Sequence, residues 1–308
     1  MRMKKRDVLT LRDLARADLD EVLSLAATLK QERGEGRQRP LLAGRKLGMV
    51  FQKPSLRTRA TFDIGMTELG GSTLFLGPDE VQMGERETPA DCVRVLSRLV
   101  DILAVRTFAQ DIVAEMARYG SVPVINALSD LYHPCQVLAD LLTLQECKGR
   151  IEGLKVAFVG DGNNVAHSWL LAAEKVPFRF VLACPEGFEP DGGILDSAVS
   201  GGADVAVTHN PAEAVSDADA IYTDVWASMG QEAEAGDRRR SFAPFQVNGE
   251  LVSRAKDDVA VMHCLPAHRG EEITDEVIEG RHSVVFDQAE NRLHAQKALM
   301  VWCLGVAA

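Results

Sequence analysis

Residues 46–71, KLGMVFQKPSLRTRATFDIGMTELGG, join an apolar run to a helical pattern through a short polar turn. The run from Leu47 to Phe51 predicts a buried strand, and beyond Pro54 apolar residues recur at helical spacing until a Gly-Gly pair ends the pattern. Ser55 stands at the helix N-cap, where a hydroxyl accepts a hydrogen bond from the first turn. We therefore expect a strand, a turn and a helix in direct succession.

The start of this helix has the chemistry of an anion site. The first backbone N–H groups of a helix lack intrahelical partners and carry a partial positive charge. The same turn here carries Ser55, Arg57, Thr58 and Arg59, and charge-assisted hydrogen bonds from guanidinium groups are about twice as strong as neutral ones. A phosphate would match these donors. Taken alone, the segment is also consistent with an N-cap followed by arginines that face solvent.

The length and composition are those of a globular protein. The chain has 308 residues, enough for a large buried core and, by the usual domain size, for two domains. Hydrophobic residues make up 46% and charged residues 26%, and no apolar run is long enough to span a membrane. The N-terminal segment MRMKKRDVLTLRDL is basic but leads into an amphipathic pattern rather than an apolar signal core. We expect a cytoplasmic protein with no membrane partner.

Net charge and cysteine spacing argue against two other classes of protein. The formal net charge is −11, whereas nucleic-acid-binding surfaces normally show a basic excess, so no nucleic-acid partner is expected and the anion site is local. The six cysteines show no C-x-x-C and no paired Cys/His spacing, so neither a disulfide framework nor a zinc site is indicated. The cysteines expected to be small buried hydrophobes are Cys92, Cys135, Cys147, Cys184 and Cys303, with Cys264 as the exception.

Strand and helix patterns alternate along almost the whole chain. After residues 47–51, we expect strands at 72–76, 102–106, 122–126, 155–160, 179–183, 204–208, 220–224 and 259–263. Helices are expected at 13–30, 90–99 and 111–119, with a long connecting helix at 134–148, whereas residues 77–88 read as a loop and only the polar span 232–240 looks loose. This order predicts an α/β protein with two doubly wound parallel-sheet domains joined by interdomain helices.

Chemically active side chains gather where the predicted strands end. In open parallel sheets, ligands bind beyond the carboxyl ends of the strands. The segments at those ends are residues 53–59, 106–107, 128–136, 161–164, 224–232 and 263–269. They are dense in Arg, His, Asp, Asn and Cys, whereas structural loops are mostly Gly, Pro and Ser. We therefore expect two half-sites that face each other across a cleft between the domains.

Five of these segments carry a family resemblance. SLRTR at 55–59, HPCQ at 133–136 and HCLP at 263–266 resemble the carbamoyl-phosphate motifs of the aspartate/ornithine transcarbamoylase family. DGNN at 161–164 and DVWASMGQE at 224–232 resemble the amino-acid-binding segments of its ornithine-specific members. The match covers essentially the whole chain in the family's order. One departure is Leu56, where several members have Thr or Met; this position is expected to act through its backbone N–H.

The resemblance implies a carbamoyl-phosphate site with donors aimed at both the phosphate and the carbonyl oxygen, on which negative charge builds during amine attack. The residues it assigns are Ser55, Leu56, Arg57, Thr58, Gln82, Arg106, His133, Gln136, Cys264, Leu265 and Arg292. Arg106, His133 and Cys264 would be catalytic, and the loop that carries Gln82 would cross to a neighbouring subunit. Taken alone, His133 also reads as a helix-start residue and Arg292 as a surface helix residue.

For the second substrate, the resemblance implies an L-ornithine site in the second half of the chain. Asp224 and Ser228 suit the α-ammonium group, and Asn164 with the backbone N–H of Met229 suits the α-carboxylate. Cys264 would lie near the reacting amine, which must lose a proton before it attacks, so a thiolate and Asp224 are candidate proton acceptors or orienting groups. A buried inert thiol is the alternative for Cys264.

The implied reaction transfers the carbamoyl group of carbamoyl phosphate to L-ornithine and gives L-citrulline and phosphate, a step of arginine metabolism that can serve arginine biosynthesis or arginine breakdown. The implied domains are residues 1–133 with a C-terminal helix at 291–308, for carbamoyl phosphate, and residues 134–290, for ornithine. The implied assembly is a homotrimer or an assembly of trimers. No metal and no organic cofactor are expected, since GDGNNVAH lacks the third glycine of a dinucleotide fingerprint.

Two alternatives stay open at this point. One is a sister transcarbamoylase for aspartate, putrescine or N-acetylornithine. Aspartate is disfavoured by the SMG segment and by HCLP, and putrescine has no α-carboxylate for Asn164 to hold. The other is a catalytically silent phosphate-binding or regulatory relative, which the presence of Arg57, Arg106, His133 and Cys264 disfavours.

Overall fold

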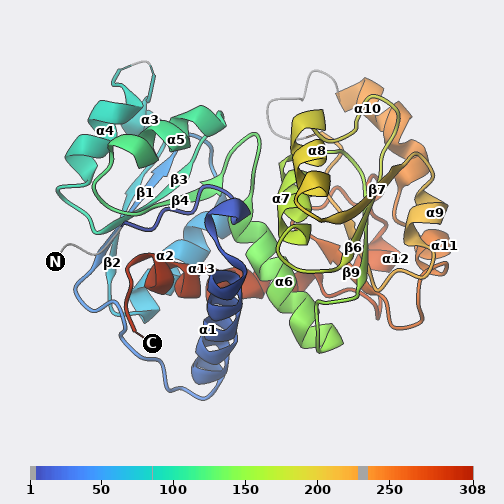
Figure 1. The fold of residues 1–308 in the computed structure, drawn as a ribbon, viewed down its shortest axis with the longest axis horizontal. Helices are drawn as coiled ribbons and strands as arrows, with labels where there is room; N and C mark the ends of the chain where they lie inside the picture. Colours follow the sequence, from blue (N-terminus) through green and yellow to red (C-terminus); the bar gives the residue numbers. More distant parts are fainter. Residues whose placement is uncertain (1–4, 85, 228–234, 308) are drawn as a thin grey trace. The chain divides into compact units, whose positions relative to one another are not determined.

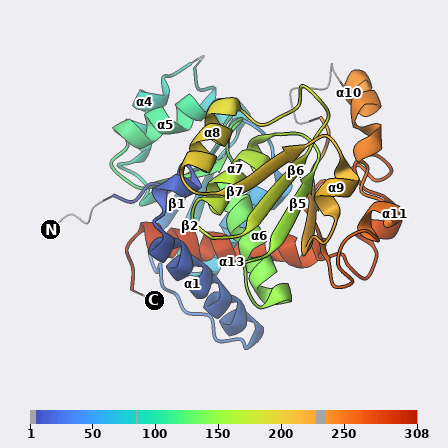
Figure 2. The ribbon, with the colours of Figure 1, turned by 45° about the vertical axis from the view of Figure 1, so that its right-hand side comes forward.

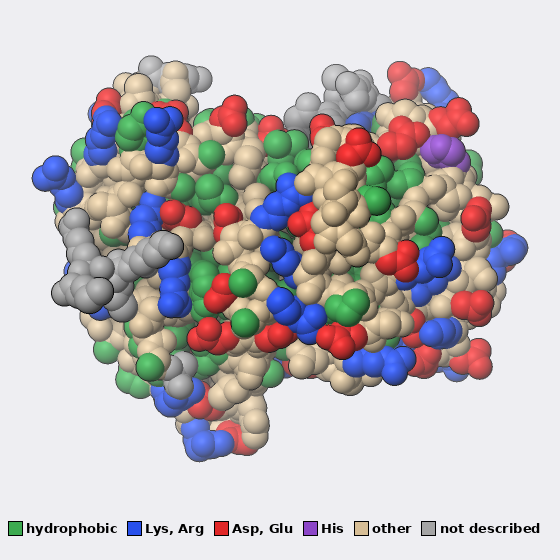
Figure 3. Space-filling model, in the orientation of Figure 1, with side chains coloured by type: hydrophobic (Ala, Val, Ile, Leu, Met, Phe, Trp, Pro, Cys, Tyr) green, Lys and Arg blue, Asp and Glu red, His purple; other side chains and the backbone are tan. Residues whose placement is uncertain are grey.

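The computed structural model describes residues 5–84, 86–227 and 235–307. The chain divides into two compact units, with Met1–Leu142 and Glu290–Ala308 in unit 1 and Thr143–Ala289 in unit 2. Among the described residues, no helix combines the length and the apolar content that a membrane crossing requires. On the face shown in Figure 3, basic and acidic side chains are interspersed, and the described residues there form no basic stripe.

Unit 1 is built on a parallel sheet in the order β2-β1-β3-β4. Its strands are β1 (Lys46–Phe51), β2 (Ser72–Leu76), β3 (Ile102–Arg106) and β4 (Val124–Leu128). Its helices are η1 (Leu11–Asp13), α1 (Arg16–Gly34), α2 (Leu56–Glu68), α3 (Pro78–Val81), α4 (Pro89–Leu96) and α5 (Gln110–Tyr119). Helices α4 and α5 cover one face of the sheet, and α2 lies on the other with α13 (Val285–Cys303) (Figure 1).

Unit 2 contains a second parallel sheet, in the order β7-β6-β5-β8-β9. Its strands are β5 (Lys155–Val159), β6 (Arg179–Ala183), β7 (Asp204–Thr208), β8 (Ala220–Thr223) and β9 (Ala260–His263). Its helices are α7 (Asn164–Ala173), α8 (Gly192–Ser200), α9 (Pro211–Val215), α10 (Ala235–Phe242), η3 (Ala243–Phe245), α11 (Gly249–Val252) and α12 (Asp275–Ile278). Helices α7 and α8 lie on one face of this sheet, and α9 and α11 lie on the other (Figures 1 and 2). The predicted α/β class with two parallel sheets is confirmed.

Two long helices run from one unit into the other along the chain. Helix α6 (Pro134–Lys148) has the bounds expected from the sequence, and α13 begins in unit 2 and ends in unit 1. The predicted strand at 122–126 instead begins at Val124, because Pro123 has no N–H for the ladder and offers only its carbonyl, which accepts from the Leu103 N–H at 2.9 Å.

Three other expectations were wrong. The span 77–88, read as a loop, contains the short helix α3 (Pro78–Val81). The polar span 232–240 is helical from Ala235 onward, as part of α10, while residues 232–234 lie outside the described residues. Cys147 is exposed rather than buried, because the last turn of α6 around it, with Gln145 and Glu146, faces solvent. Cys92, Cys135, Cys184 and Cys303 are buried as expected.

Helices α2 and α13 are joined by an ion pair between a buried lysine and a partly buried glutamate. The Lys297 ammonium, only 1% exposed, lies 2.7 Å from a Glu68 carboxylate oxygen, and Arg33 donates to the other oxygen at 2.8 Å. Gly65 permits this approach, since a Cβ there would lie 3.0 Å from Lys297 Cγ. Burial acts to raise the pKa of Glu68, but the hydrogen bonds from Lys297 and Arg33 outweigh it, so the pKa is lowered.

Glu68→Ala should lower the free energy of unfolding by about 3–5 kcal/mol, because it leaves the Lys297 ammonium buried without its carboxylate. Since the folded-state pKa of Glu68 lies below its ordinary value of 4.5, this contribution is full above that pH and fades as the pH falls through the folded-state value. Chemical denaturation across this pH range measures both effects. The matched control is Asp20→Ala, which breaks the exposed Arg16–Asp20 pair and should cost less than about 1 kcal/mol; equal losses would contradict the prediction.

The turn after β5 requires a glycine for close approach of two backbone segments. A Cβ on Gly162 would lie 2.3 Å from Pro190 N and 2.5 Å from Glu189 C. Both contacts are to backbone atoms, which cannot move aside as a side chain would. The turn that carries Asn163 and Asn164 is therefore fixed by contact with residues 189–190.

Gly162→Ala should destabilise the protein by about 1–3 kcal/mol, since the overpacked turn must shift against backbone. Thermal or chemical denaturation measures the change. Gly192→Ala serves as the control, because nothing lies within 4 Å of a Cβ built there, and it should be near neutral. A Gly162→Ala protein as stable as this control would show that the turn can relax.

Candidate active site

In unit 1, the predicted anion site is a helix start at the edge of the sheet. Ser55 is the N-cap of α2, and its hydroxyl accepts a hydrogen bond from the Thr58 N–H at 3.3 Å. Leu56 follows as the first helical residue, with its side chain 82% exposed. The Leu56 side chain therefore does not pack in the core. The group that this residue offers at the helix start is its backbone N–H.

Buried positive charge surrounds this helix start. Phe51 of β1 is in register with Arg106 of β3, which brings Arg106 to the sheet edge from which the chain enters the turn. Arg106 is 7% exposed, and among the described residues it forms no ion pair. Burial, and then the charges of Arg292 and Arg57, lower the pKa of Arg106 to about 10. A bound anion would offset this accumulated charge.

Arg292 and His133 complete the cluster from two other helices. The Arg292 Nη2 of α13 donates to Thr58 Oγ1 at 2.9 Å, and both residues are buried. His133, directly before α6, is 4% exposed. Burial, and then Arg292 and Arg106, hold the pKa of His133 well below its ordinary value, so its imidazole is neutral near neutral pH. A neutral imidazole can donate one hydrogen bond without adding charge.

Gln136 and Gln82 lie in different surroundings. Gln136 in the first turn of α6 is 1% exposed, and its Nε2 donates to Asp140 Oδ1 at 2.8 Å. Gln82, after α3, is exposed with a left-handed backbone (φ 39°), and its side chain forms no hydrogen bond with other described residues. Unit 1 thus brings together Ser55, Thr58, Arg106, His133 and Arg292, with Arg57 close enough to affect Arg106 electrostatically, but does not engage Gln82.

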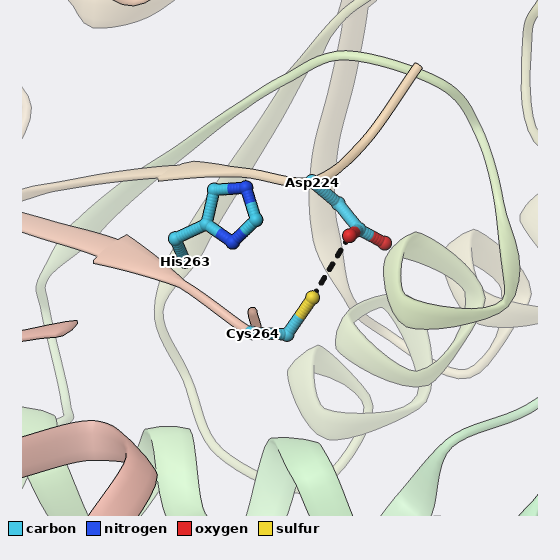
Figure 4. Close-up of side chains that lie close together, drawn as sticks. All are labelled: Asp224, His263 and Cys264. Atoms are coloured by element: carbon cyan, nitrogen blue, oxygen red, sulfur yellow. Dashed lines mark hydrogen bonds between the residues drawn. The ribbon is translucent and has the colours of Figure 1, made fainter. Parts of the chain in front are cut away.

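In unit 2, Asp224 and Cys264 meet at the ends of neighbouring strands. Thr223 of β8 is in register with His263 of β9, so the residues that follow them are adjacent. The Cys264 thiol donates to Asp224 Oδ1, with Sγ and Oδ1 2.8 Å apart (Figure 4). Asp224 is 7% exposed. The pair places a carboxylate and a thiol where an ammonium group could bind.

Asn163 is a site residue that sequence reasoning missed. Its Nδ2 donates to Asp224 Oδ2 at 2.8 Å, and its Oδ1 caps α7 by accepting from the Val165 and Ala166 N–H groups. Asn164, predicted to hold a carboxylate, is the half-buried first residue of α7. An asparagine directly before a helical pattern is an N-cap signal, and this signal would have identified Asn163.

The turn after β9 is held by the His263 ring. His263 Nε2 lies 3.0 Å from Glu272 Oε1, and Nδ1 accepts from the Leu265 N–H at 2.8 Å. Leu265 has a left-handed backbone (φ 57°), which is costly for a residue with a Cβ. Potential ligand atoms of Asp224, His263 and Cys264 lie within 4.8 Å of one another. Because both His263 nitrogens are engaged, this group offers two ligand atoms for a metal rather than three.

Arg238 ties the start of α10 to two of the predicted segments. Its Nη1 lies 2.7 Å from Asp161 Oδ2 and 2.8 Å from the Trp226 carbonyl oxygen, and its guanidinium lies over the Phe188 ring. Burial raises the pKa of Asp161, and the Arg238 bonds only partly offset it. In the sequence, Arg238 is one of three consecutive arginines with no distinguishing signal. Ser228 and Met229, predicted to bind ornithine, lie outside the described residues.

Comparison with known proteins gives matches over the whole chain. Residues 6–146 match the carbamoyl-P binding domain of aspartate/ornithine carbamoyltransferase, and residues 152–303 match its Asp/Orn binding domain. The ornithine carbamoyltransferase of Thermococcus kodakarensis is 54% identical over 304 residues, which cover 97% of this chain and 96% of that protein.

Two solved structures have the same fold along their whole length. Ornithine carbamoyltransferase from Pyrococcus furiosus aligns with a TM-score of 0.95 at 50% identity, covering 99% of both chains. That from Thermus thermophilus aligns with a TM-score of 0.89 at 44% identity, covering 98% of this chain and 100% of the other. With both halves of the sequence matched and the half-site motifs in place, the chain belongs to the aspartate/ornithine carbamoyltransferase family.

Proposed function

We propose that this chain transfers the carbamoyl group of carbamoyl phosphate to the side-chain amine of L-ornithine, giving L-citrulline and phosphate. The observation that carries the proposal is Arg106, which is buried, forms no ion pair with any other described residue and lies near the charges of Arg57 and Arg292, an environment that favours a doubly charged phosphate. The relatives named ornithine carbamoyltransferase support ornithine as the acceptor. A relative from Pyrococcus furiosus named as anabolic, 51% identical, supports a role in arginine biosynthesis.

The donors of unit 1 are assigned to carbamoyl phosphate. Ser55, the Leu56 N–H, Arg57, Thr58 and Arg106 would hold the phosphate. Arg106, neutral His133, Gln136 and Arg292 would surround the carbamoyl group. The family resemblance assigns Cys264 and Leu265 of unit 2 to the same substrate. Such fixed donors are typically worth about 3–4 kcal/mol each where charge develops on a carbonyl oxygen in the transition state.

The polar groups of unit 2 are assigned to ornithine. Asp224, with Ser228, would bind the α-ammonium group, and Asn164, with the Met229 N–H, would bind the α-carboxylate. The side-chain ammonium first loses a proton, and Cys264 or Asp224, which are hydrogen-bonded to each other, would accept or direct it. The amine nitrogen then attacks the carbonyl carbon, the carbon–oxygen bond to phosphate breaks, and phosphate leaves with the electron pair. The attacking nitrogen gives up its second proton, which the departing phosphate takes. Direct attack needs no covalent intermediate on the enzyme.

The proposed assembly is a homotrimer, or trimers stacked into larger particles. The Gln82 side chain is exposed and forms no hydrogen bond with the described residues of its own unit, which supports the assignment of its loop to a neighbour's site. A closed cyclic trimer would then contain three shared sites.

The amine acceptor can be tested directly by measuring citrulline formation with a panel of amines. L-ornithine should be the preferred substrate. N-acetylornithine should be rejected by orders of magnitude, because its neutral amide would leave the buried charge of Asp224 without a cation. Lysine, with one extra methylene, should lose only about 1–3 kcal/mol of transition-state binding. Putrescine should also react poorly, since it has no carboxylate. A preference for N-acetylornithine or putrescine would refute the ornithine assignment, and no transfer to any amine would refute the proposed function.

Asp224→Ala should raise the KM for ornithine by about 100-fold or more, because the α-ammonium loses its carboxylate, and should leave carbamoyl-phosphate affinity nearly intact. Steady-state kinetics with each substrate varied in turn separates the two effects. Asp196→Ala, at an exposed position of α8 in the same unit, is the control and should leave both constants unchanged. Equal losses for both substrates would contradict the assignment of Asp224.

Shared sites can be tested by mixing two inactive variants. Gln82→Ala and Arg106→Ala chains are each expected to be inactive alone. In mixed trimers, some sites combine an intact Gln82 with an intact Arg106, and random exchange of equal amounts should restore about a quarter of wild-type activity. Citrulline assays before and after subunit exchange measure the recovery. No recovery after verified exchange would count against shared sites.

A further inference from the structure

One hydrogen bond in unit 1 fixes the direction in which a proposed substrate-binding amide faces. Gln136 and Asp140 lie one turn apart on α6, and Gln136 Nε2 donates to Asp140 Oδ1 at 2.8 Å. Gln136 is 1% exposed and Asp140 is 0% exposed. A carboxylate can only accept hydrogen bonds, so it requires the NH2 end of the Gln136 amide to face it.

The opposite end of the amide is therefore an acceptor with a defined direction. Among the described residues, Gln136 Oε1 is buried and has no hydrogen-bond partner. A buried acceptor without a donor costs about 1–3 kcal/mol, so a ligand that supplies an N–H there gains by satisfying it. The other groups of unit 1 that we assign to the carbamoyl group, Arg106, Arg292 and neutral His133, are donors or can donate.

Carbamoyl phosphate matches this single acceptor. Its phosphate oxygens and carbonyl oxygen accept hydrogen bonds, and only its NH2 group donates to an amide oxygen. We propose that Asp140 is a positioning residue that holds Gln136 with its oxygen toward the carbamoyl NH2 group, and that this pair selects carbamoyl phosphate over acyl phosphates that lack an N–H. The inference rests on the proposed function and assigns Gln136 to the nitrogen of the carbamoyl group.

The test substitutes Asp140 by asparagine, which has nearly the same shape. An asparagine amide can donate or accept, so Gln136 is then able to turn over and present its NH2 group instead. The probes are carbamoyl phosphate and acetyl phosphate, in which a methyl group replaces the NH2 group. Calorimetry without ornithine gives Kd for each, and the ratio of the two Kd values is the readout.

The wild-type protein should bind carbamoyl phosphate at least about tenfold more tightly than acetyl phosphate, and in Asp140→Asn this ratio should fall about tenfold. If the role of Asp140 were purely structural, Asp140→Asn would raise the Kd of both ligands by the same factor and leave the ratio unchanged. The proposal is overturned if folded Asp140→Asn keeps the wild-type ratio. If that variant does not fold, Asp140→Ser gives the same comparison with the same two outcomes.

A double-substitution cycle shows whether Asp140 acts through Gln136. In a Gln136→Ala background, Asp140→Asn should change the ratio less than about twofold, because the amide it orients is gone. A further tenfold fall in that background would overturn the proposal. The matched control is Asp219→Asn in unit 2, a buried carboxylate that accepts from Lys155 N and Lys256 Nζ. It should lower stability without changing the ratio.

These binding measurements separate failure of the inference from failure of the proposed function. Absence of citrulline from every amine would refute the proposed function, and it would leave the two Kd values measurable. Citrulline formation together with an unchanged ratio in Asp140→Asn would refute only the positioning role.

Discussion

Parallel strands in register end at one edge of their sheet, and both half-sites of this protein depend on that constraint. In unit 1 the pairing of Phe51 with Arg106 brings a buried guanidinium to the edge that leads into the start of α2. In unit 2 the pairing of Thr223 with His263 makes Asp224 and Cys264 neighbours. Backbone hydrogen bonding between strands thus brings residues that are far apart in the sequence next to one another, independently of side-chain contacts.

The two half-sites differ in their electrostatics: unit 1 gathers buried positive charge, and unit 2 holds a hydrogen-bonded carboxylate. Unit 1 buries Arg106, which forms no ion pair with other described residues, near the charges of Arg292 and Arg57, and it keeps His133 neutral, an environment that favours an anion. Unit 2 satisfies its carboxylate in advance, since Asp224 accepts from Asn163, Cys264 and the Val225 N–H. Binding of an anion should therefore stabilise unit 1, because it offsets the repulsion that Arg292 and Arg57 exert on Arg106.

The sequence predicts most of the fold because the local signals agree with the tertiary structure. Apolar spacing predicts the strand at Leu47 to Phe51 and the bounds of α6, and capping chemistry predicts Ser55 as the N-cap of α2. The roles of Asp140 and Arg238 could not be predicted, because each depends on one hydrogen-bond geometry within a helix or between distant segments. Cys147 was placed wrongly because apolar composition does not reveal which turn of a helix extends beyond the core.

Arg238 has a consequence for how this protein could diverge. A single guanidinium contacts both the Trp226 carbonyl and Asp161, so the two ends of the chain segment between Trp226 and Arg238 are fixed at one point. Replacement of Arg238 would break both contacts at once and would leave the carboxylate of Asp161, whose pKa burial already raises, without its cation. A change at Asp161, just after β5, would likewise be felt at Trp226, which follows β8. These two strand ends are therefore expected to change together rather than independently as the sequence diverges.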